Sequence, residues 1–257
     1  MQKEENKFTP SVVFEGMTSI RAILNGGYCE KNNRRIEKIL FDKDKLSKIG
    51  KEIGYLRAIS EERGFTLHPT DNESLSEMCL GNSHGGIVAV CNDRHIPALS
   101  TATIKENGFY VMIQGIEDPY NFGYSLRSLY ACGCDGIILP ERNWMSAAGV
   151  VARSSAGASE LFGMYNSEPE EAVKEFKKLG YNIVCADERT DNILGKCELK
   201  FPILLIVGGE KRGISKSIIE KSDTLVKIEY AREFRASLSA ASATTMFAYE
   251  IMRQNSN

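Results

Sequence analysis

The sequence predicts an α/β protein with a mostly parallel sheet, and three observations support this. Short apolar runs of the buried-strand type recur along the chain. They alternate with longer segments of helical spacing, an order typical of a sheet with helices on both faces. The chain has 257 residues, enough for one large domain or two small ones.

The first predicted domain covers residues 11–91. Its expected helices are residues 12–24, 46–63 and 73–79. Its expected strands are residues 36–41, 65–67 and 86–90. Gly26-Gly27 and Gly64 mark helix ends, because glycine is favoured just past a helix C-terminus. A unit of this size is small but within the range of independent folding.

A polar segment, residues 92–107, contains Pro97 and Ser100 and is predicted to be a linker. The second predicted domain covers residues 108–257. Its expected strands are residues 109–113, 136–139, 161–165, 182–185, 203–207 and 224–228. Its expected helices are residues 121–132, 168–179 and 237–253.

The composition favours a cytoplasmic protein without metal or disulfides. No apolar stretch approaches the roughly 20 residues of a membrane span, and the N-terminus is polar. The seven cysteines are scattered and odd in number, unlike a disulfide framework. Neither they nor the three histidines show metal-ligand spacing. The net charge of −2 gives no support to nucleic-acid binding, which would need local basic patches.

Ligands of parallel α/β sheets bind at the carboxyl ends of the strands. The first polar segment at such an end runs from Gln114 to Gly123. Asp118-Pro119 is a turn pair, and Asn121 is a good helix N-cap. Arg127 lies on an otherwise apolar helix, where an arginine is expected to need a partner. Arg127 could pair with a residue of the fold, which is a structural role, or with a ligand, which is a functional one. The sequence alone leaves both open.

The second segment follows the most apolar strand and contains Gly208, Gly209 and Gly213. It matches neither a phosphate-binding loop nor a dinucleotide fingerprint. A close backbone contact, either to a small molecule or to another loop, remains. The third segment leads from Ile228 through a charged loop into a helix rich in Ala and Ser, for which Ser237 is a well-placed N-cap.

Together the segments read D-P-x-N-x-G-x-x-x-R, then G-G-E-x-x-G, then a strand, a loop and an S-L-x-x-A helix. This order resembles the SpoU/TrmH family of RNA 2′-O-ribose methyltransferases, within the wider SPOUT class. The resemblance spans roughly Gly108 to Arg253 and includes the stretch 150–158. Residues 11–91, ending in the run 84–89, resemble the ribosomal-protein-L30e-like substrate-binding domain often found in front.

The resemblance implies a sheet whose C-terminal segment forms a trefoil knot, a homodimer, and S-adenosylmethionine as cofactor. By matching position, backbone at Gly208, Ile228 and Leu238 would hold the cofactor. The pocket would also be lined by Ala186, Val207, Gly209, Gly213 and Tyr230.

By the same resemblance, the active centre would consist of Asn121, Arg127, Glu210 and Ser237. A ribose 2′-hydroxyl would attack the sulfonium methyl, so the protein must align the two and help remove a proton. Arg127 is either the base or a clamp for a phosphate beside the ribose. The second role suits a guanidinium, whose planar donors match phosphate oxygens.

The third motif departs from the family pattern. Glu229 and Tyr230 replace the usual proline and methionine, and Ser239 and Ala241 replace an asparagine and a serine. Arg232 and Arg235 fit either a changed RNA contact or a solvated loop. The leading hypothesis is a ribose methyltransferase acting on RNA, ribosomal rather than transfer RNA. The alternatives are a non-catalytic RNA-binding protein with a degenerate methyltransferase domain and a methyltransferase with another acceptor.

Overall fold

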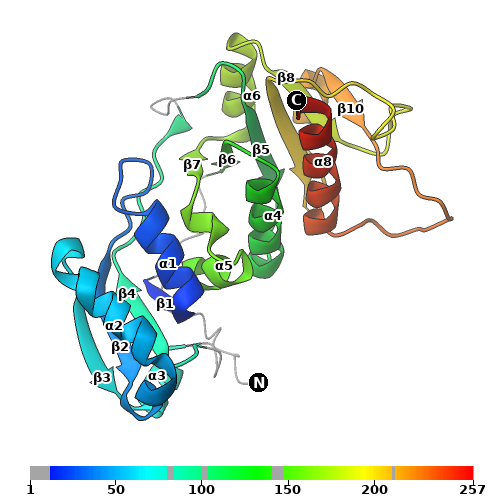
Figure 1. The fold of residues 1–257 in the computed structure, drawn as a ribbon. Coiled ribbons are helices and arrows are strands. Elements are labelled where there is room, and N and C mark those ends of the chain that lie inside the picture. The colour runs from blue at the N-terminus through cyan, green and yellow to red at the C-terminus, as the bar shows by residue number, and fades with distance from the viewer. Residues whose placement is uncertain (1–11, 80–83, 100–103, 141–146, 210–211, 257) are drawn as a thin grey trace, which may run out of the picture. The chain divides into compact units, whose positions relative to one another are not determined.

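The computed structural model describes residues 12–79, 84–99, 104–140, 147–209 and 212–256 (Figure 1). By their internal contacts these residues form two compact units. Unit 1 consists of residues within 1–95 and 143–161, and unit 2 of residues within 96–142 and 162–257. Residues 147–161, which the sequence placed in the second domain, therefore share their contacts with the N-terminal residues.

Unit 1 contains a four-stranded sheet in the order β1-β4-β2-β3. β1 (Val13–Glu15) and β2 (Ile36–Asp42) both pair antiparallel with β4 (Ile87–Cys91). β3 (Thr66–Thr70) pairs parallel with β2. The helices of this unit are α1 (Gly16–Gly26), η1 (Lys43–Lys45), α2 (Leu46–Arg63), α3 (Asn72–Met78), α5 (Ala148–Ser154) and η4 (Ala158–Glu160).

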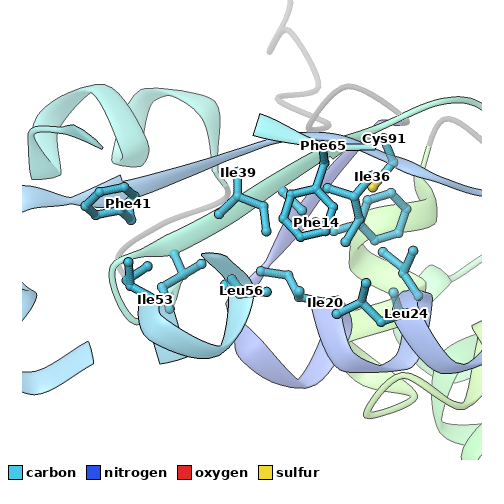
Figure 2. Close-up of a cluster of buried hydrophobic side chains, with 14 of the residues drawn as sticks. Phe14, Ile20, Leu24, Ile36, Ile39, Phe41, Ile53, Leu56, Phe65 and Cys91 are labelled. Carbon is cyan, nitrogen blue, oxygen red and sulfur yellow. The ribbon is translucent and has the colours of Figure 1, made fainter. Parts of the chain in front are cut away.

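The core of unit 1 lies between this sheet and its helices. Phe14, Ile39 and Leu56 are fully buried and come from β1, β2 and α2 (Figure 2). Ala148 and Ala152 of α5 belong to the same cluster. The short helix α5 therefore contributes to a hydrophobic core formed mainly by residues about a hundred positions earlier in the chain.

A buried polar cluster also links Glu160, in the stretch 147–161, to the N-terminal residues of unit 1. The Arg34 guanidinium donates to the Glu160 carboxylate over 3.0 Å, and the Asn32 amide donates to the same carboxylate over 2.9 Å. Burial alone would raise the pKa of Glu160, but the Arg34 and Arg94 guanidiniums hold that pKa below its usual value. Glu160 is 3% exposed, so it stays charged in the interior only with these partners.

Unit 2 contains a six-stranded, fully parallel sheet in the order β10-β8-β9-β5-β6-β7, counted over the described residues. Its strands are β5 (Phe109–Gln114), β6 (Gly136–Leu139), β7 (Gly163–Asn166), β8 (Asn182–Ala186), β9 (Ile203–Gly208) and β10 (Thr224–Val226). The predicted α/β class with a mostly parallel sheet is confirmed. β5 and β9 lie in the middle, so their carboxyl ends meet at the centre of one sheet edge.

Helices pack on this sheet. α6 (Pro169–Lys178) and α7 (Lys216–Lys221) contribute Phe176 and Ile218 to one apolar cluster with β5, β8 and β9. α4 (Pro119–Ala131) and α8 (Ala240–Asn255) pack on each other. The Thr245 hydroxyl of α8 donates to the Ser128 hydroxyl of α4 over 2.7 Å.

The structure corrects several predicted elements. Residues 12–24 were expected to be one helix, but β1 precedes α1, because its three buried residues pair with β4. The closing helix begins at Ala240 and not at Ser237. The sequence reading missed α5, η4 and α7, each of seven residues or fewer, too short for helical periodicity to stand out.

Candidate functional site at the carboxyl edge of the parallel sheet

Strand register brings four predicted cofactor residues to neighbouring positions. Cys185 pairs with Ile206, so Ala186 at the end of β8 lies level with Val207 of β9. Gln114 pairs with Gly208, and Val226 pairs with Ala186. Parallel strands end at the same edge of a sheet. Ala186, Val207, Gly208 and the following Gly209 therefore meet there.

The glycines of the second segment are required by loop packing. A Cβ added to Gly208 would lie 2.7 Å from the Gly213 backbone, and one at Gly209 would lie 2.3 Å from the Gly115 carbonyl oxygen. The Gly213 N–H donates to the Gly209 carbonyl over 3.1 Å, which closes the turn. The close backbone contact observed for Gly209 is to another loop, at Gly115, whereas Gly208 packs on Gly213 within its own loop.

Gln114 holds the first two segments together, a role that the sequence reading missed. Its side-chain oxygen accepts from the Ser215 N–H over 2.9 Å, and its side-chain nitrogen donates to the Ser215 hydroxyl over 3.2 Å. Its main-chain oxygen accepts from the Gly209 N–H over 2.6 Å. A glutamine ending a buried strand, before a turn, was the available signal, because its amide can bond at both ends.

The first segment caps α4 differently from the prediction. Asp118, and not Asn121, is the N-cap, and its carboxylate accepts from the N–H groups of Tyr120 and Asn121 over 3.1 and 3.3 Å. Pro119 occupies the first turn, where its lack of an N–H has no cost. Asn121 is half-buried in that first turn, at the same edge of the sheet as the end of β5.

Arg127 lies on an exposed face of α4. The expectation that it is an arginine on an apolar face in need of a partner is wrong, because its side chain is exposed. It makes no hydrogen bond or ion pair with any residue that the structure describes. Tyr124 and Tyr120, one and two turns earlier, share this face and are 50% and 41% exposed. Glu210, the residue expected beside Arg127 in the active centre, lies outside the described residues.

The third segment forms a long loop between β10 and α8, drawn in orange in Figure 1. Ile228 and Leu238, expected to hold the cofactor through their backbone, are half-buried. The Leu238 N–H donates to the Tyr230 hydroxyl over 3.2 Å, which joins the two ends of the loop. The structure therefore brings these two cofactor candidates, Tyr230 and Leu238, into direct contact.

The two serines of the third motif take different positions. Ser239 is the N-cap of α8, and its hydroxyl accepts from the Ser242 N–H over 3.2 Å. The predicted N-cap role of Ser237 is therefore wrong. Ser237 is exposed in the loop, two residues before the cap. Among the described residues no hydrogen bond joins its side chain to Asn121 or Arg127, so these three members of the predicted centre are not directly bonded.

The turn after β8 adds a charged pair that the sequence reading did not single out. Arg189 donates two hydrogen bonds to the Asp187 carboxylate, over 2.9 and 2.8 Å. These bonds hold the pKa of Asp187 below its usual value. The Asp187 N–H donates to the Val226 carbonyl over 3.0 Å, so this carboxylate lies where β8 and β10 end. The signal was an acidic residue directly after a buried parallel strand.

Part of this edge is open, and small or apolar residues lie at several of its strand ends. Gly213 has a φ of +60°, and a Cβ there would meet nothing within 4 Å, so this part of the edge is open. Ala186 ends β8 and Ile228 follows β10, and both are half-buried at the ends of neighbouring strands. Small and apolar residues of this kind are compatible with the adenosine part of S-adenosylmethionine.

Two further observations concern what the described residues contain. In these residues no group of three or more His, Cys, Asp or Glu side chains is placed to hold a metal ion. Across the same part of the chain, no helix has both the length and the apolar character needed to span a membrane.

Comparison with known proteins identifies the family. Residues 108–249, more than half of the chain, match the sequence model of the SpoU rRNA Methylase family. The chain is 29% identical over 196 residues to a 23S rRNA (guanosine-2′-O-)-methyltransferase RlmB of Shewanella oneidensis, covering 74% of this chain and 79% of that protein. It is 27% identical over 232 residues to the RlmB of Ralstonia nicotianae, covering 87% and 90%.

The fold agrees with this assignment. The structure is similar to that of the SpoU methyltransferase AviRb from Streptomyces viridochromogenes in complex with the cofactor AdoMet, with a TM-score of 0.77. That likeness covers 94% of this chain and 89% of the other at 24% identity, which shows a shared fold. From the matching sequence model, with the fold in agreement, this chain belongs to the SpoU rRNA Methylase family.

Proposed function

We propose that this protein transfers a methyl group from S-adenosylmethionine to a ribose 2′-hydroxyl of ribosomal RNA. The observation that carries the proposal is the meeting of the three motif segments at one edge of the parallel sheet, in a chain of this family. Two RlmB relatives named for guanosine 2′-O-methylation of 23S rRNA support the ribose and the RNA. The AviRb structure, which contains AdoMet, supports the cofactor.

The cofactor, when bound, supplies an electrophilic methyl group on a sulfonium. Gly208, Ile228 and Leu238 are proposed to hold it through their backbone. Arg127 is proposed to bind a phosphate beside the target ribose, because its exposed guanidinium stays protonated and suits phosphate oxygens. Asn121, Glu210 and Ser237 complete the proposed centre.

The same site is proposed to be completed by a second copy of the chain. Tyr120, Tyr124 and Arg127 form one exposed face of α4, and Met246 and Tyr249 of the adjoining α8 are 43% and 57% exposed. Half-exposed aromatic side chains gathered on packed helices are typical of an interface. A homodimer through this face would also give Arg127 partners. Sedimentation velocity should show a dimer, and Tyr124→Glu should yield monomers.

The remaining proposals concern organisation. We propose that residues 11–91 form an RNA-binding domain of the L30e type, followed by a linker at 92–107 and the methyltransferase domain at 108–257. The resemblance to the family supports this division, as it supports a trefoil knot in the C-terminal part. A cytoplasmic location follows from an RNA-modifying role.

The test is transfer of labelled methyl from S-adenosylmethionine to unmodified ribosomal RNA by the native chain and by Arg127→Ala. We expect label at one site that resists alkaline cleavage, as a 2′-O-methylated linkage does. Arg127→Ala should abolish transfer and leave the cofactor Kd nearly unchanged, as measured by calorimetry. Gly208→Val should instead weaken cofactor binding first, because its side chain would meet the Gly213 backbone.

The outcomes separate the alternatives. Label on a base and not on a ribose would contradict the proposal that the methyl acceptor is a ribose 2′-hydroxyl. Loss of cofactor binding in Arg127→Ala would contradict its proposed role. If the native chain binds RNA but transfers no methyl, the non-catalytic RNA-binding protein becomes the better description.

A further inference from the structure

We propose that the loop at residues 229–236, here called the aromatic loop, binds an unpaired base of the RNA substrate. The base would stack on Phe234, beside Tyr230, while Arg232 and Arg235 contact the adjoining phosphates. This inference rests on the proposed function and names a substrate-binding element for it. The family resemblance assigned Tyr230 to the cofactor, whereas this proposal concerns its ring.

The aromatic loop exposes apolar surface that no described part of the chain covers. All eight of its residues are exposed or half-exposed. Phe234 is 59% exposed, the largest value among the exposed large hydrophobic residues described, and Tyr230 is 41% exposed. The ring centroids of the two lie 6.1 Å apart with an interplanar angle of 58°. Phe234 is wholly apolar, so exposing its ring to water costs free energy. Such exposure favours a role in binding.

Contacts at both ends of the aromatic loop restrain the position of its two rings. The Leu238 N–H donates to the Tyr230 hydroxyl, and the Lys196 ammonium lies 2.9 Å from the Glu229 carboxylate. Figure 1 shows the segment leaving the sheet after β10 and returning to α8. Restraint of this kind lowers the entropic cost of binding a ligand on the loop.

The charges of the loop favour a polyanion. Lys196 pairs with Glu229, and Glu233 is the other acidic residue of the loop. Arg235 lies 3.6 Å from the Glu233 carboxylate, but both side chains are more than four-fifths exposed, so this pair is weak and readily exchanged for a phosphate. Arg232 makes no ion pair within the described residues.

An aromatic ring flanked by arginines has the chemistry of single-stranded RNA recognition. Unstacked bases stack on aromatic faces and on guanidinium planes, and arginine suits phosphate oxygens. The loop begins directly after Ile228, a proposed cofactor-binding residue. The base-binding element is therefore continuous in the chain with a residue proposed to hold the methyl donor.

The test measures RNA binding separately from methyl transfer. Full-length protein is titrated against unmodified 23S ribosomal RNA transcript in a filter-binding assay, with S-adenosylmethionine present. Phe234→Ala should raise the RNA Kd about 10-fold, because it removes the aromatic face on which the base stacks. Phe234→Trp should keep native affinity. The cofactor Kd should be the same in both variants.

Matched controls come from α6 and the residue after it. Leu179→Ala truncates an apolar side chain that is 51% exposed and should leave the RNA Kd unchanged. Arg232→Gln with Arg235→Gln should reduce the slope of log Kd against log salt by about 1, as expected for lost contacts to single-stranded phosphates. Lys178→Gln, a single exposed charge on α6, should leave that slope unchanged.

Two results would overturn the inference while leaving the proposed function in place. One is native methyl transfer with an unchanged RNA Kd in Phe234→Ala. The other is conversion of Phe234→Ala to monomers in sedimentation velocity, which would make the loop a contact between copies of the chain. If the native chain binds RNA through Phe234 but transfers no methyl, the inference holds and the proposed function fails. No RNA binding by the native chain would overturn both.

Discussion

Gly209→Ala tests the packing of the motif loops at the sheet edge. A Cβ at this position would lie 2.3 Å from the Gly115 oxygen, 2.5 Å from the Gly115 carbon and 2.9 Å from the Ile116 nitrogen. Ordinary contact begins at 3.4 Å, so the nearest pair must separate by 1.1 Å (3.4 minus 2.3). The obstacle is backbone next to buried strands, and no flexible side chain can move aside.

The size of the effect follows from two terms. Overpacking of this kind destabilises a protein by about 1–3 kcal/mol. Separation of the loops also stretches the bond from the Gly209 N–H to the Gln114 carbonyl, which contributes about 1 kcal/mol. We therefore expect the free energy of unfolding to fall by about 2–4 kcal/mol. The Kd for S-adenosylmethionine should rise in parallel, because Gly208 and Gly213 move with the displaced loop.

Urea unfolding followed by circular dichroism measures this change, with Gly54→Ala as the control. Gly54 is exposed on α2, and a Cβ there would meet nothing within 4 Å. Alanine should therefore raise stability by about 0.5–1 kcal/mol through its higher helix propensity. A loss under about 0.5 kcal/mol in Gly209→Ala, within the range of ordinary surface changes, would refute the steric reasoning.

Three further predictions concern the caps and the buried polar groups. Ser239→Ala should lower the free energy of unfolding by about 1 kcal/mol through loss of the α8 N-cap. Ser237→Ala should change it by less than about 0.5 kcal/mol while reducing methyl transfer; equal destabilisation would argue against this assignment of the cap. Burial lowers the pKa of His84, with Lys45 as a further cause, so the neutral ring favours the folded state. The urea midpoint should be highest above about pH 6.5 and fall as the pH drops through the folded pKa, less so in His84→Gln; equal profiles would exclude His84 as the source. Arg34→Met should cost about 3–5 kcal/mol, because Glu160 stays buried without its main partner. Adding Glu160→Leu to Arg34→Met should recover much of that loss in the free energy of unfolding. If the losses of the two single variants simply add in the double variant, the two residues are not coupled.

Much of the secondary structure could be predicted because local pattern carried it. The runs that begin at Phe109, Gly136 and Ile203 were apolar enough to be buried strands, and the structure has β5, β6 and β9 there. α2 ends at Arg63 with Gly64 in the left-handed conformation, as its sequence indicated. The prediction failed at β1, where pairing with the distant strand β4 outweighs the helical spacing of the apolar residues. It also failed at short helices such as α5, which are stabilised by packing rather than by local sequence.

For the candidate site, sequence order identified the segments, and strand register decided which residues meet. Asp118 and not Asn121 caps α4, because the proline that follows Asp118 suits the first helical position. The role of Gln114 depends on Ser215, which is 101 residues away, so no local pattern could show it. Whether Arg127 is buried depends on which face of α4 meets the sheet.

The sequence by itself determined the alternation of strands and helices, the glycines and polar residues at the strand ends, and the resemblance to a methyltransferase family. These are properties of spacing and residue type, which act over a few residues. Only the tertiary structure decided that Gly209 packs on Gly115, that residues 147–161 share a core with the N-terminal residues, and that Phe234 is exposed. Such contacts join residues far apart in the chain, and they exist only once strand order and register are set.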